Sequence, residues 1–178
     1  MIPILLALAF IVLLFVVVIA GQPKEFKVCR STKISATPDA VFSHVNDFHQ
    51  WEAWSPWAKL DPACKNTFAG AAAGTGAIFS WAGNKKVGEG RMTIQESLAS
   101  NVIRINLEFF KPFKATNTAE FIFRPEGDQT IVTWSMFGKN NFMGRIFNLI
   151  VNCENMVGRD FERGLAAIKS LLEVPAKK

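Results

Sequence analysis

The stretch Val102-Ile-Arg-Ile-Asn-Leu-Glu-Phe109 alternates apolar and polar side chains from its second residue onward. Successive side chains of a strand point to opposite faces, so four apolar residues share one face: Ile103, Ile105, Leu107 and Phe109. The polar residues between them share the other face. This pattern predicts a strand of an antiparallel sheet with one face in water and the other covered by the rest of the domain.

The same period of two extends through residues 64–138. Residues 118–124 and 132–136 alternate in the same way, and turn-forming residues gather at 70–76, 83–86 and 124–128. We therefore expect this part of the chain to form about six strands joined by short turns.

Beyond residue 142 the apolar period becomes helical. Apolar side chains recur at steps of four, four, three and four: Val157, Phe161, Leu165, Ile168 and Leu172. This spacing draws one stripe along a helix of about 20 residues. We expect the helix to begin at 152–154, after a shorter helix around 144–150, and to lie across the concave face of the sheet.

Before the sheet, residues 26–34 predict a first strand, and Thr37 and Pro38 predict the N-cap and first position of a helix. A second short helix is expected over residues 48–53. Three tryptophans recur at every third position here: Trp51, Trp54 and Trp57. They either pack the short helices against the edge of the sheet, or form the rim of a pocket or an interfacial contact with lipid headgroups.

The first twenty residues are apolar except for Pro3 and carry no charge, although 20% of the whole chain is charged. As a helix, residues 2–20 would span about 28 Å, close to the roughly 30 Å hydrocarbon core of a bilayer. No Lys or Arg precedes this run, and it is longer than the apolar core of a signal peptide. These features favour a membrane anchor. The alternative is a signal peptide that is cleaved near Ala20, in which case the domain would be exported.

Four basic residues follow the apolar run: Lys24, Lys27, Arg30 and Lys33. The positive-inside rule therefore predicts a single-pass protein with its domain on the cytoplasmic side. The net charge of +5 is scattered, and no nucleic-acid motif is present, so we expect no nucleic-acid partner. A domain that faces anionic lipid accounts for the same charge.

Cys29, Cys64 and Cys153 lack the spacing of a zinc site or of a disulfide framework, and we interpret them as structural thiols. We expect no metal and no cofactor. The sequence does not indicate whether the protein has a protein partner.

The order of these elements and several motifs resemble the helix-grip (SRPBCC) superfamily, which includes the START lipid-transfer domains, the birch-pollen-allergen-like proteins and the polyketide cyclase/dehydrase group. The most specific stretch consists of these residues: Pro38, Val41, Phe42, Val45, Asp47, Trp51, Trp54, Ser55, Pro56 and Trp57. Further matches are found at 81–84, 88–92 and 158–169. The resemblance implies an α+β fold in which a curved antiparallel sheet of about seven strands wraps around a long C-terminal helix.

The resemblance also implies a ligand cavity between the sheet and the long helix. The alternation of the strands and the helical stripe indicate the residues that line it: Trp54, Phe79, Trp81, Met92, Ile105, Leu107, Phe109, Phe121, Trp134, Met136, Met156 and Phe161. This lining suits a hydrophobic ligand, although the same residues would also form an ordinary core. Gly158 and Gly164, inside the long helix, indicate close packing on the sheet or access for a ligand.

Acid–base chemistry has less support, and we assign no catalytic residue. His44 and His49 are the only histidines, are expected at the surface or at helix ends, and there is no Tyr. Glu108 and Glu120 fall on the water-facing side of their strands, beside arginines, which indicates cross-strand ion pairs. Two helix carboxylates remain as cavity candidates: Glu154 and Asp160.

The sequence thus predicts four parts: a transmembrane anchor at 1–20, a short linker at 21–25, a helix-grip domain at 26–173 and a basic tail at 174–178. The favoured function is binding of a hydrophobic small molecule or lipid beside a membrane. The alternatives are an enzyme of the polyketide cyclase/dehydrase kind and a protein-interaction module of the same fold.

Overall fold

A computed structural model describes residues 2–140 and 153–173 of the chain. Its helices and strands are, in order, α1 (Ile2–Ala20), β1 (Glu25–Ile34), α2 (Pro38–Asn46), the 3-10 helix η1 (Phe48–Gln50), α3 (Trp51–Trp54), β2 (Lys65–Gly70), β3 (Ala77–Ala82), β4 (Glu89–Leu98), β5 (Val102–Lys111), β6 (Ala115–Glu126), β7 (Gln129–Lys139) and α5 (Cys153–Leu172). The order of elements confirms the predicted α+β class. The short helix expected around 144–150 lies outside the described residues.

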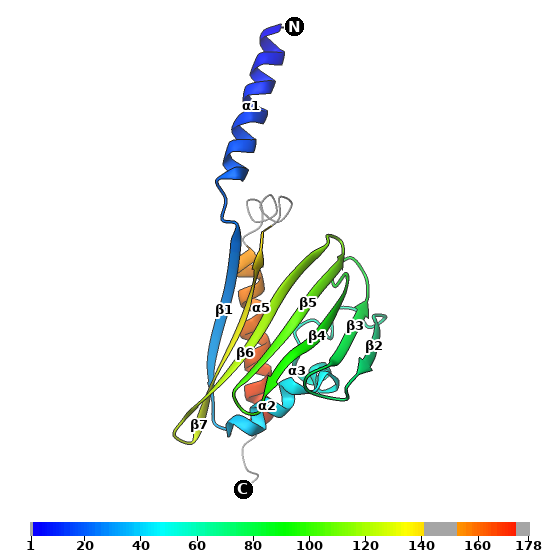
Figure 1. The fold of residues 1–178 in the computed structure, drawn as a ribbon, viewed down its shortest axis with the longest axis vertical. Helices are drawn as coiled ribbons and strands as arrows, with labels where there is room; N and C mark the ends of the chain where they lie inside the picture. The colour runs from blue at the N-terminus through cyan, green and yellow to red at the C-terminus, as the bar shows by residue number, and fades with distance from the viewer. Residues whose placement is uncertain (1, 141–152, 174–178) are drawn as a thin grey trace.

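Seven strands form one antiparallel sheet in the order β1-β7-β6-β5-β4-β3-β2. Figure 1 shows the sheet curving, with α5 running along its concave face beside β1. The main contacts of α5 are with β1, β7, α2 and α3. The helix-grip architecture predicted from the sequence is therefore confirmed.

The register of the strands places the predicted apolar residues on the concave face. Ile105 pairs with Ile94 on one side and with Ala119 on the other, and all three are buried. On the convex face, Arg104 forms ion pairs with Glu96 and with Glu120. Arg91 likewise pairs with Glu108, at 2.8 Å, so the predicted cross-strand ion pairs are confirmed.

The long helix α5 packs closely on the sheet at Gly164, which has no side chain. A Cβ atom there would lie 2.8 Å from Trp134 Cζ3, in a ring that is held in the core, and this distance is too short for a methyl group. A Cβ at Gly158 would lie 2.2 Å from Arg30 Nη2, but this is the end of a flexible side chain that can move aside. Gly164 therefore permits close approach of helix and sheet, which supports the packing interpretation over ligand access at that position.

The N-terminal helix α1 stands apart from the domain, and nearly all its side chains are exposed (Figure 1). By length and composition it is able to cross a membrane. Its link to the sheet is short and is held at its far end, since the backbone N–H of Asn140 donates to the Lys24 carbonyl at 2.8 Å. The Asn140 side chain also donates to the Pro23 carbonyl at 3.2 Å.

Candidate functional site

Beneath α5 the concave face is filled by an aromatic cluster around Trp134. Its indole is stacked between two phenylalanines, with ring centroids 4.8 Å from Phe121 and 4.0 Å from Phe161. Trp54 meets its edge at 5.6 Å and Trp57 at 5.8 Å. The predicted row of tryptophans therefore packs the short helices onto the sheet, and Trp54 is only 2% exposed.

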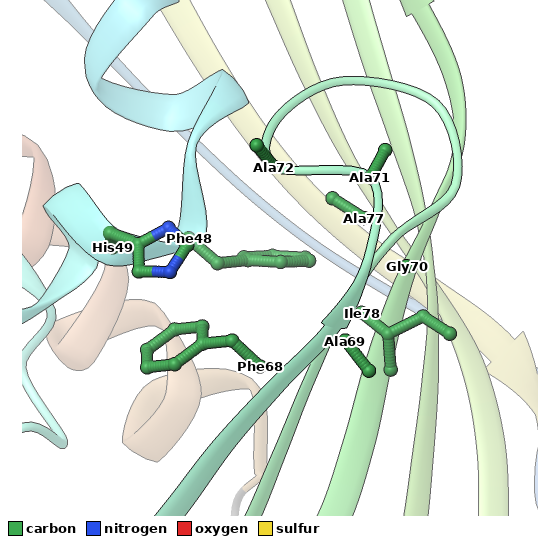
Figure 2. Close-up of a pocket in the computed structure, with 9 residues that line it drawn as sticks. All are labelled: Phe48, His49, Phe68, Ala69, Gly70, Ala71, Ala72, Ala77 and Ile78. Carbon is green, nitrogen blue, oxygen red and sulfur yellow. The ribbon is translucent and has the colours of Figure 1, made fainter.

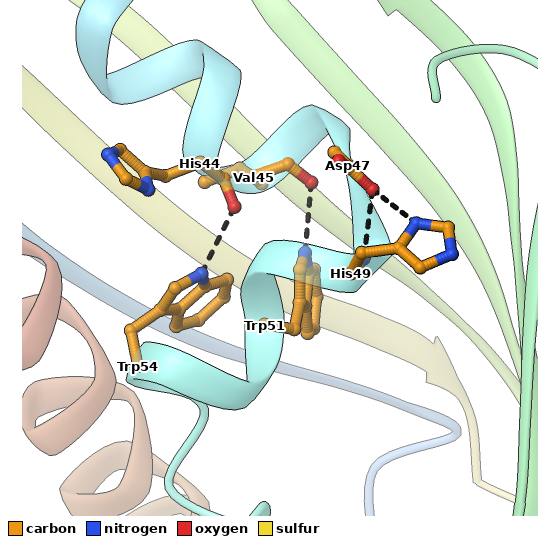
Figure 3. Close-up of polar contacts among 6 residues, drawn as sticks. All are labelled: His44, Val45, Asp47, His49, Trp51 and Trp54. Atoms are coloured by element: carbon orange, nitrogen blue, oxygen red, sulfur yellow. Dashed lines mark hydrogen bonds and ion pairs between the residues drawn. The ribbon is translucent and has the colours of Figure 1, made fainter. Parts of the chain in front are cut away.

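The indole N–H groups of this cluster differ in their partners. Trp51 Nε1 donates to the Val45 carbonyl at 2.9 Å and Trp54 Nε1 donates to the His44 carbonyl at 3.1 Å, as Figure 3 shows. Both carbonyls lie in the last turn of α2, where a helix leaves its C=O groups without partners. Trp134 Nε1, in contrast, is buried and has no hydrogen-bond acceptor among residues 2–140 and 153–173. An unpaired buried donor is costly, so this N–H is an uncompensated polar group within the aromatic cluster.

The other half of the concave face carries aromatic side chains that are only half-buried. Phe79 and Trp81 stack with centroids 6.0 Å apart, and Trp81 meets Phe109 edge to face at 5.9 Å. We call these three residues the aromatic shelf. Gly90 lies against the shelf, since a Cβ there would be 2.4 Å from Trp81 Cζ2. The shelf belongs to β3 and β5, away from the main contacts of α5.

One amide group lies on this apolar face. Asn117 on β6 pairs with Leu107 and with Gly138 in the register of the sheet and is 9% exposed. A Cβ at Gly138 would come within 2.4 Å of Asn117 Oδ1, so the glycine makes room for the amide. The Asn117 side chain forms no hydrogen bond in the part of the chain that the structure describes. It offers both a donor and an acceptor to a ligand on the concave face.

A second arrangement, which the sequence did not indicate, lies where η1 meets β2. Asp47 caps η1 by accepting from the His49 backbone N–H at 2.9 Å, and the same oxygen bonds His49 Nδ1 at 2.7 Å (Figure 3). Burial raises the pKa of the Asp47 carboxyl, but these hydrogen bonds outweigh burial, and the pKa lies below its ordinary value of 3.8. The imidazole stacks on Phe68 with centroids 4.1 Å apart.

His49 of this pair lines a pocket of about 210 Å³ between η1 and the β2–β3 hairpin. Figure 2 shows its lining: Phe48, His49, Phe68, Ala69, Gly70, Ala71, Ala72, Ala77 and Ile78. The pocket is mostly apolar, and the ring of His49 is its one titratable group. His44, half-buried at the end of α2, does not line it.

The predicted lining residues fall into three groups by exposure. Eight are buried: Trp54, Met92, Ile105, Leu107, Phe121, Trp134, Met136 and Phe161. The aromatic shelf is half-buried. Met156 is 46% exposed, so it does not belong to the buried part of the predicted lining. Consecutive residues of an α-helix are rotated by about 100° around its axis. Met156 is therefore rotated by this angle from Val157, the first residue of the apolar stripe, and faces solvent.

None of the candidate carboxylates and described thiols is fully buried. Glu154 is exposed, and Asp160 pairs with Arg163 one turn along α5 at 3.3 Å, so neither candidate carboxylate is buried in the cavity. Cys29 and Cys64 are free thiols. Among residues 2–140 and 153–173, no three His, Cys, Asp or Glu side chains are grouped closely enough to hold a metal ion.

A family model described as polyketide cyclase / dehydrase and lipid transport matches residues 25–173, which include the whole sheet and α5. The chain belongs to this polyketide cyclase/dehydrase and lipid transport family. The predicted resemblance to the polyketide cyclase/dehydrase group is thus confirmed. No curated protein matches the chain.

Solved structures share the fold of this family member at low sequence identity. Protein MLL2253 from Mesorhizobium loti matches with a TM-score of 0.63 and 14% identity, over 85% of this chain and all 100% of its own. Protein CV1439 from Chromobacterium violaceum matches at 0.58 and 14%, over 86% and 99%. The Aha1 dimer from Colwellia psychrerythraea matches at 0.57 and 12%, over 85% and 99%. These similarities establish the fold alone.

Proposed function

We propose that the chain binds a hydrophobic small molecule or lipid on the concave face of its sheet and is held at a membrane by α1. The observation that carries this proposal is the aromatic shelf of Phe79, Trp81 and Phe109. A folded domain gains by burying such side chains, yet these three remain half-buried on a concave surface. An apolar ligand laid on the shelf would complete their burial.

A polar group on the strand next to the shelf favours a ligand with one polar end. The amide of Asn117, opposite Leu107 of β5, lies on the concave face without a partner in the described chain. A few polar groups in an apolar site fix the orientation of a ligand. The family description, which includes lipid transport, agrees with a ligand of this kind.

The membrane part of the proposal rests on α1. This helix has no charged residue and a mean hydropathy of 3.4, and it lies outside the domain. It would hold the concave face next to a bilayer, which stores hydrophobic ligands. The basic residues that follow it favour the cytoplasmic side.

The test is recovery of a bound ligand. The full chain is purified in nanodiscs made of one synthetic lipid, extracted with organic solvent and analysed by mass spectrometry. We expect a hydrophobic compound other than the synthetic lipid, present above the level of empty nanodiscs. Recovery of no such compound would overturn the proposal.

A matched pair of variants locates the site. Leu107→Trp places an indole beside the shelf and should abolish recovery, whereas Leu171→Trp makes the same change at a residue of α5 that is 41% exposed and should leave recovery unchanged. Equal recovery from the two variants would exclude the shelf as the binding surface.

A second candidate function is proton transfer at the pocket beside η1, as in an enzyme of the cyclase/dehydrase kind. It is favoured by one observation, the 2.7 Å bond that orients the His49 imidazole on Asp47 at the edge of this pocket. A carboxylate–imidazole pair is a common general base. Incubation of the recovered compound with wild-type protein and with His49→Gln tests it, because only wild-type protein should change the compound's mass or isomeric form. An unchanged compound in both samples would reject this function.

A further inference from the structure

The hairpin tips at one end of the sheet differ sharply in chemistry from those at the other. Strands β3 and β5 run toward the end of the sheet from which α1 emerges (Figure 1). The turn between β3 and β4 and the turn between β5 and β6 therefore both lie at this end. The turn between β6 and β7 lies at the opposite end. We call the two turns near α1 the α1-side tips, defined as residues 83–88 and 110–114.

The α1-side tips combine exposed aromatic and basic side chains. Phe110 is 43% and Phe113 is 52% exposed, although large apolar residues are usually buried in a folded domain. Lys85 and Lys86 are exposed on the neighbouring tip. Lys111 pairs with Glu89 at 2.7 Å but keeps 68% of its side chain in solvent.

The opposite end of the sheet carries acidic residues instead. Asp39 lies in the first turn of α2, and Glu126 and Asp128 flank the turn between β6 and β7. All three are exposed. Lys33, which forms an ion pair with Glu126, and the exposed Arg124 offset part of this charge. The domain is thus polarised, with its basic and aromatic end facing the direction of α1.

The short connection to α1 keeps this end close to whatever α1 enters. Three residues separate the last residue of α1 from Lys24, whose carbonyl is bonded to Asn140 at the end of β7. A free segment of this length spans about 10 Å at most. The domain therefore has little room to move away from the end of α1.

From these observations we propose that the α1-side tips dock on an anionic lipid surface. Phe110 and Phe113 would enter the boundary between headgroups and acyl chains, and Lys85 and Lys86 would contact the negatively charged headgroups. Aromatic rings and lysines are the side chains that favour this boundary. The inference rests on α1 as a membrane anchor, but it is independent of ligand binding on the shelf.

The test uses the full chain, with its three cysteines replaced by Ser, reconstituted into vesicles of phosphatidylcholine and phosphatidylglycerol. The environment-sensitive fluorophore NBD is attached at one introduced cysteine at a time: Phe113→Cys at an α1-side tip, Asp128→Cys at the opposite end and Phe10→Cys inside α1. We expect emission from position 113 to be blue-shifted and quenched several-fold more by nitroxide-labelled lipid than emission from position 128. A label at Lys86→Cys gives the same comparison from the second tip if the label at 113 disturbs the fold.

Each result decides the proposal. In vesicles of phosphatidylcholine alone, the shift at 113 should shrink, and Lys85→Glu combined with Lys86→Glu should shrink it in anionic vesicles. Equal quenching at 113 and 128, with position 10 quenched, would overturn docking while leaving the anchor intact. An unquenched label at 10 would overturn the anchor and, with it, this inference, without affecting ligand recovery from the shelf.

Discussion

Replacing Trp134 by Phe should cost less stability than the same replacement at Trp51. Both indoles are buried, at 2% and 6% exposure, so the two substitutions remove the same atoms from similar surroundings. Trp51→Phe also removes the 2.9 Å hydrogen bond to the Val45 carbonyl and leaves that acceptor unpaired. Trp134→Phe removes a donor that has no acceptor in the described part of the chain and keeps an aromatic ring between Phe121 and Phe161.

The expected difference follows from the cost of unpaired buried groups. Leaving one buried donor or acceptor without a partner costs about 1–3 kcal/mol. Trp51→Phe creates one such group and Trp134→Phe removes one, so the variants differ by two unpaired groups. We therefore expect the first to lower the free energy of unfolding by about 2–6 kcal/mol more than the second.

The assay is urea unfolding of the full chain in detergent micelles, followed by far-ultraviolet circular dichroism. Tryptophan fluorescence is unsuitable, since each variant removes a tryptophan. The m-value should stay constant if the variants alter stability alone. A loss at Trp134→Phe that equals or exceeds the loss at Trp51→Phe would refute the interpretation of Trp134 Nε1 as an unpaired donor.

Three further predictions use the same unfolding assay. Gly164→Ala should destabilise the protein by about 1–2 kcal/mol, because the new Cβ would lie 2.8 Å from Trp134 Cζ3. This clash should outweigh the better helix propensity of Ala. The loss of stability should be smaller when Trp134 is also replaced by Phe. Gly127→Ala should cost about 1–2 kcal/mol through its φ of +63° alone, since nothing lies within 4 Å of the new Cβ; a neutral result would contradict this. The backbone N–H of Ser35 lowers the pKa of Glu173 below 4.5, so this carboxylate stabilises the fold above about pH 4.5 and the benefit is lost as pH falls through its lowered pKa. Glu173→Gln should therefore differ from wild type at neutral pH and converge with it in acid, whereas a constant difference would argue against the linkage.

The fold was predictable because its signals are local and periodic. The alternation beginning at Ile103 places every second residue of β5 on the concave face, and the stripe through Phe161 and Leu165 determines which side of α5 faces the sheet. The N-cap at Thr37, whose side chain accepts from Ala40 N, was predicted from residue types alone. Each of these features depends on neighbours within a few positions in the chain.

The site was less predictable because its features depend on three-dimensional surroundings. The bond between Asp47 and His49 forms because Asp47 has an extended backbone and caps η1, and an Asp two residues before a His was the only signal available. No pattern in the chain reveals that Trp134 lacks an acceptor while Trp54 has one. The exposure of Met156 was not predicted because a list of apolar residues does not include the rotation of about 100° that separates it from Val157 of the stripe.

The direct connection of α1 to β1 has a mechanical consequence. β1 pairs with β7 along its whole length, from Glu25 opposite Lys139 to Ile34 opposite Thr130. A force that pulls on α1 along the axis of β1 loads all the hydrogen bonds of this pair in parallel, in shear, instead of opening them one after another. The strand that joins the domain to its N-terminal helix is therefore well suited to bear tension. The sheet should remain folded at forces that would separate two strands pulled apart from one end, where the hydrogen bonds break one at a time.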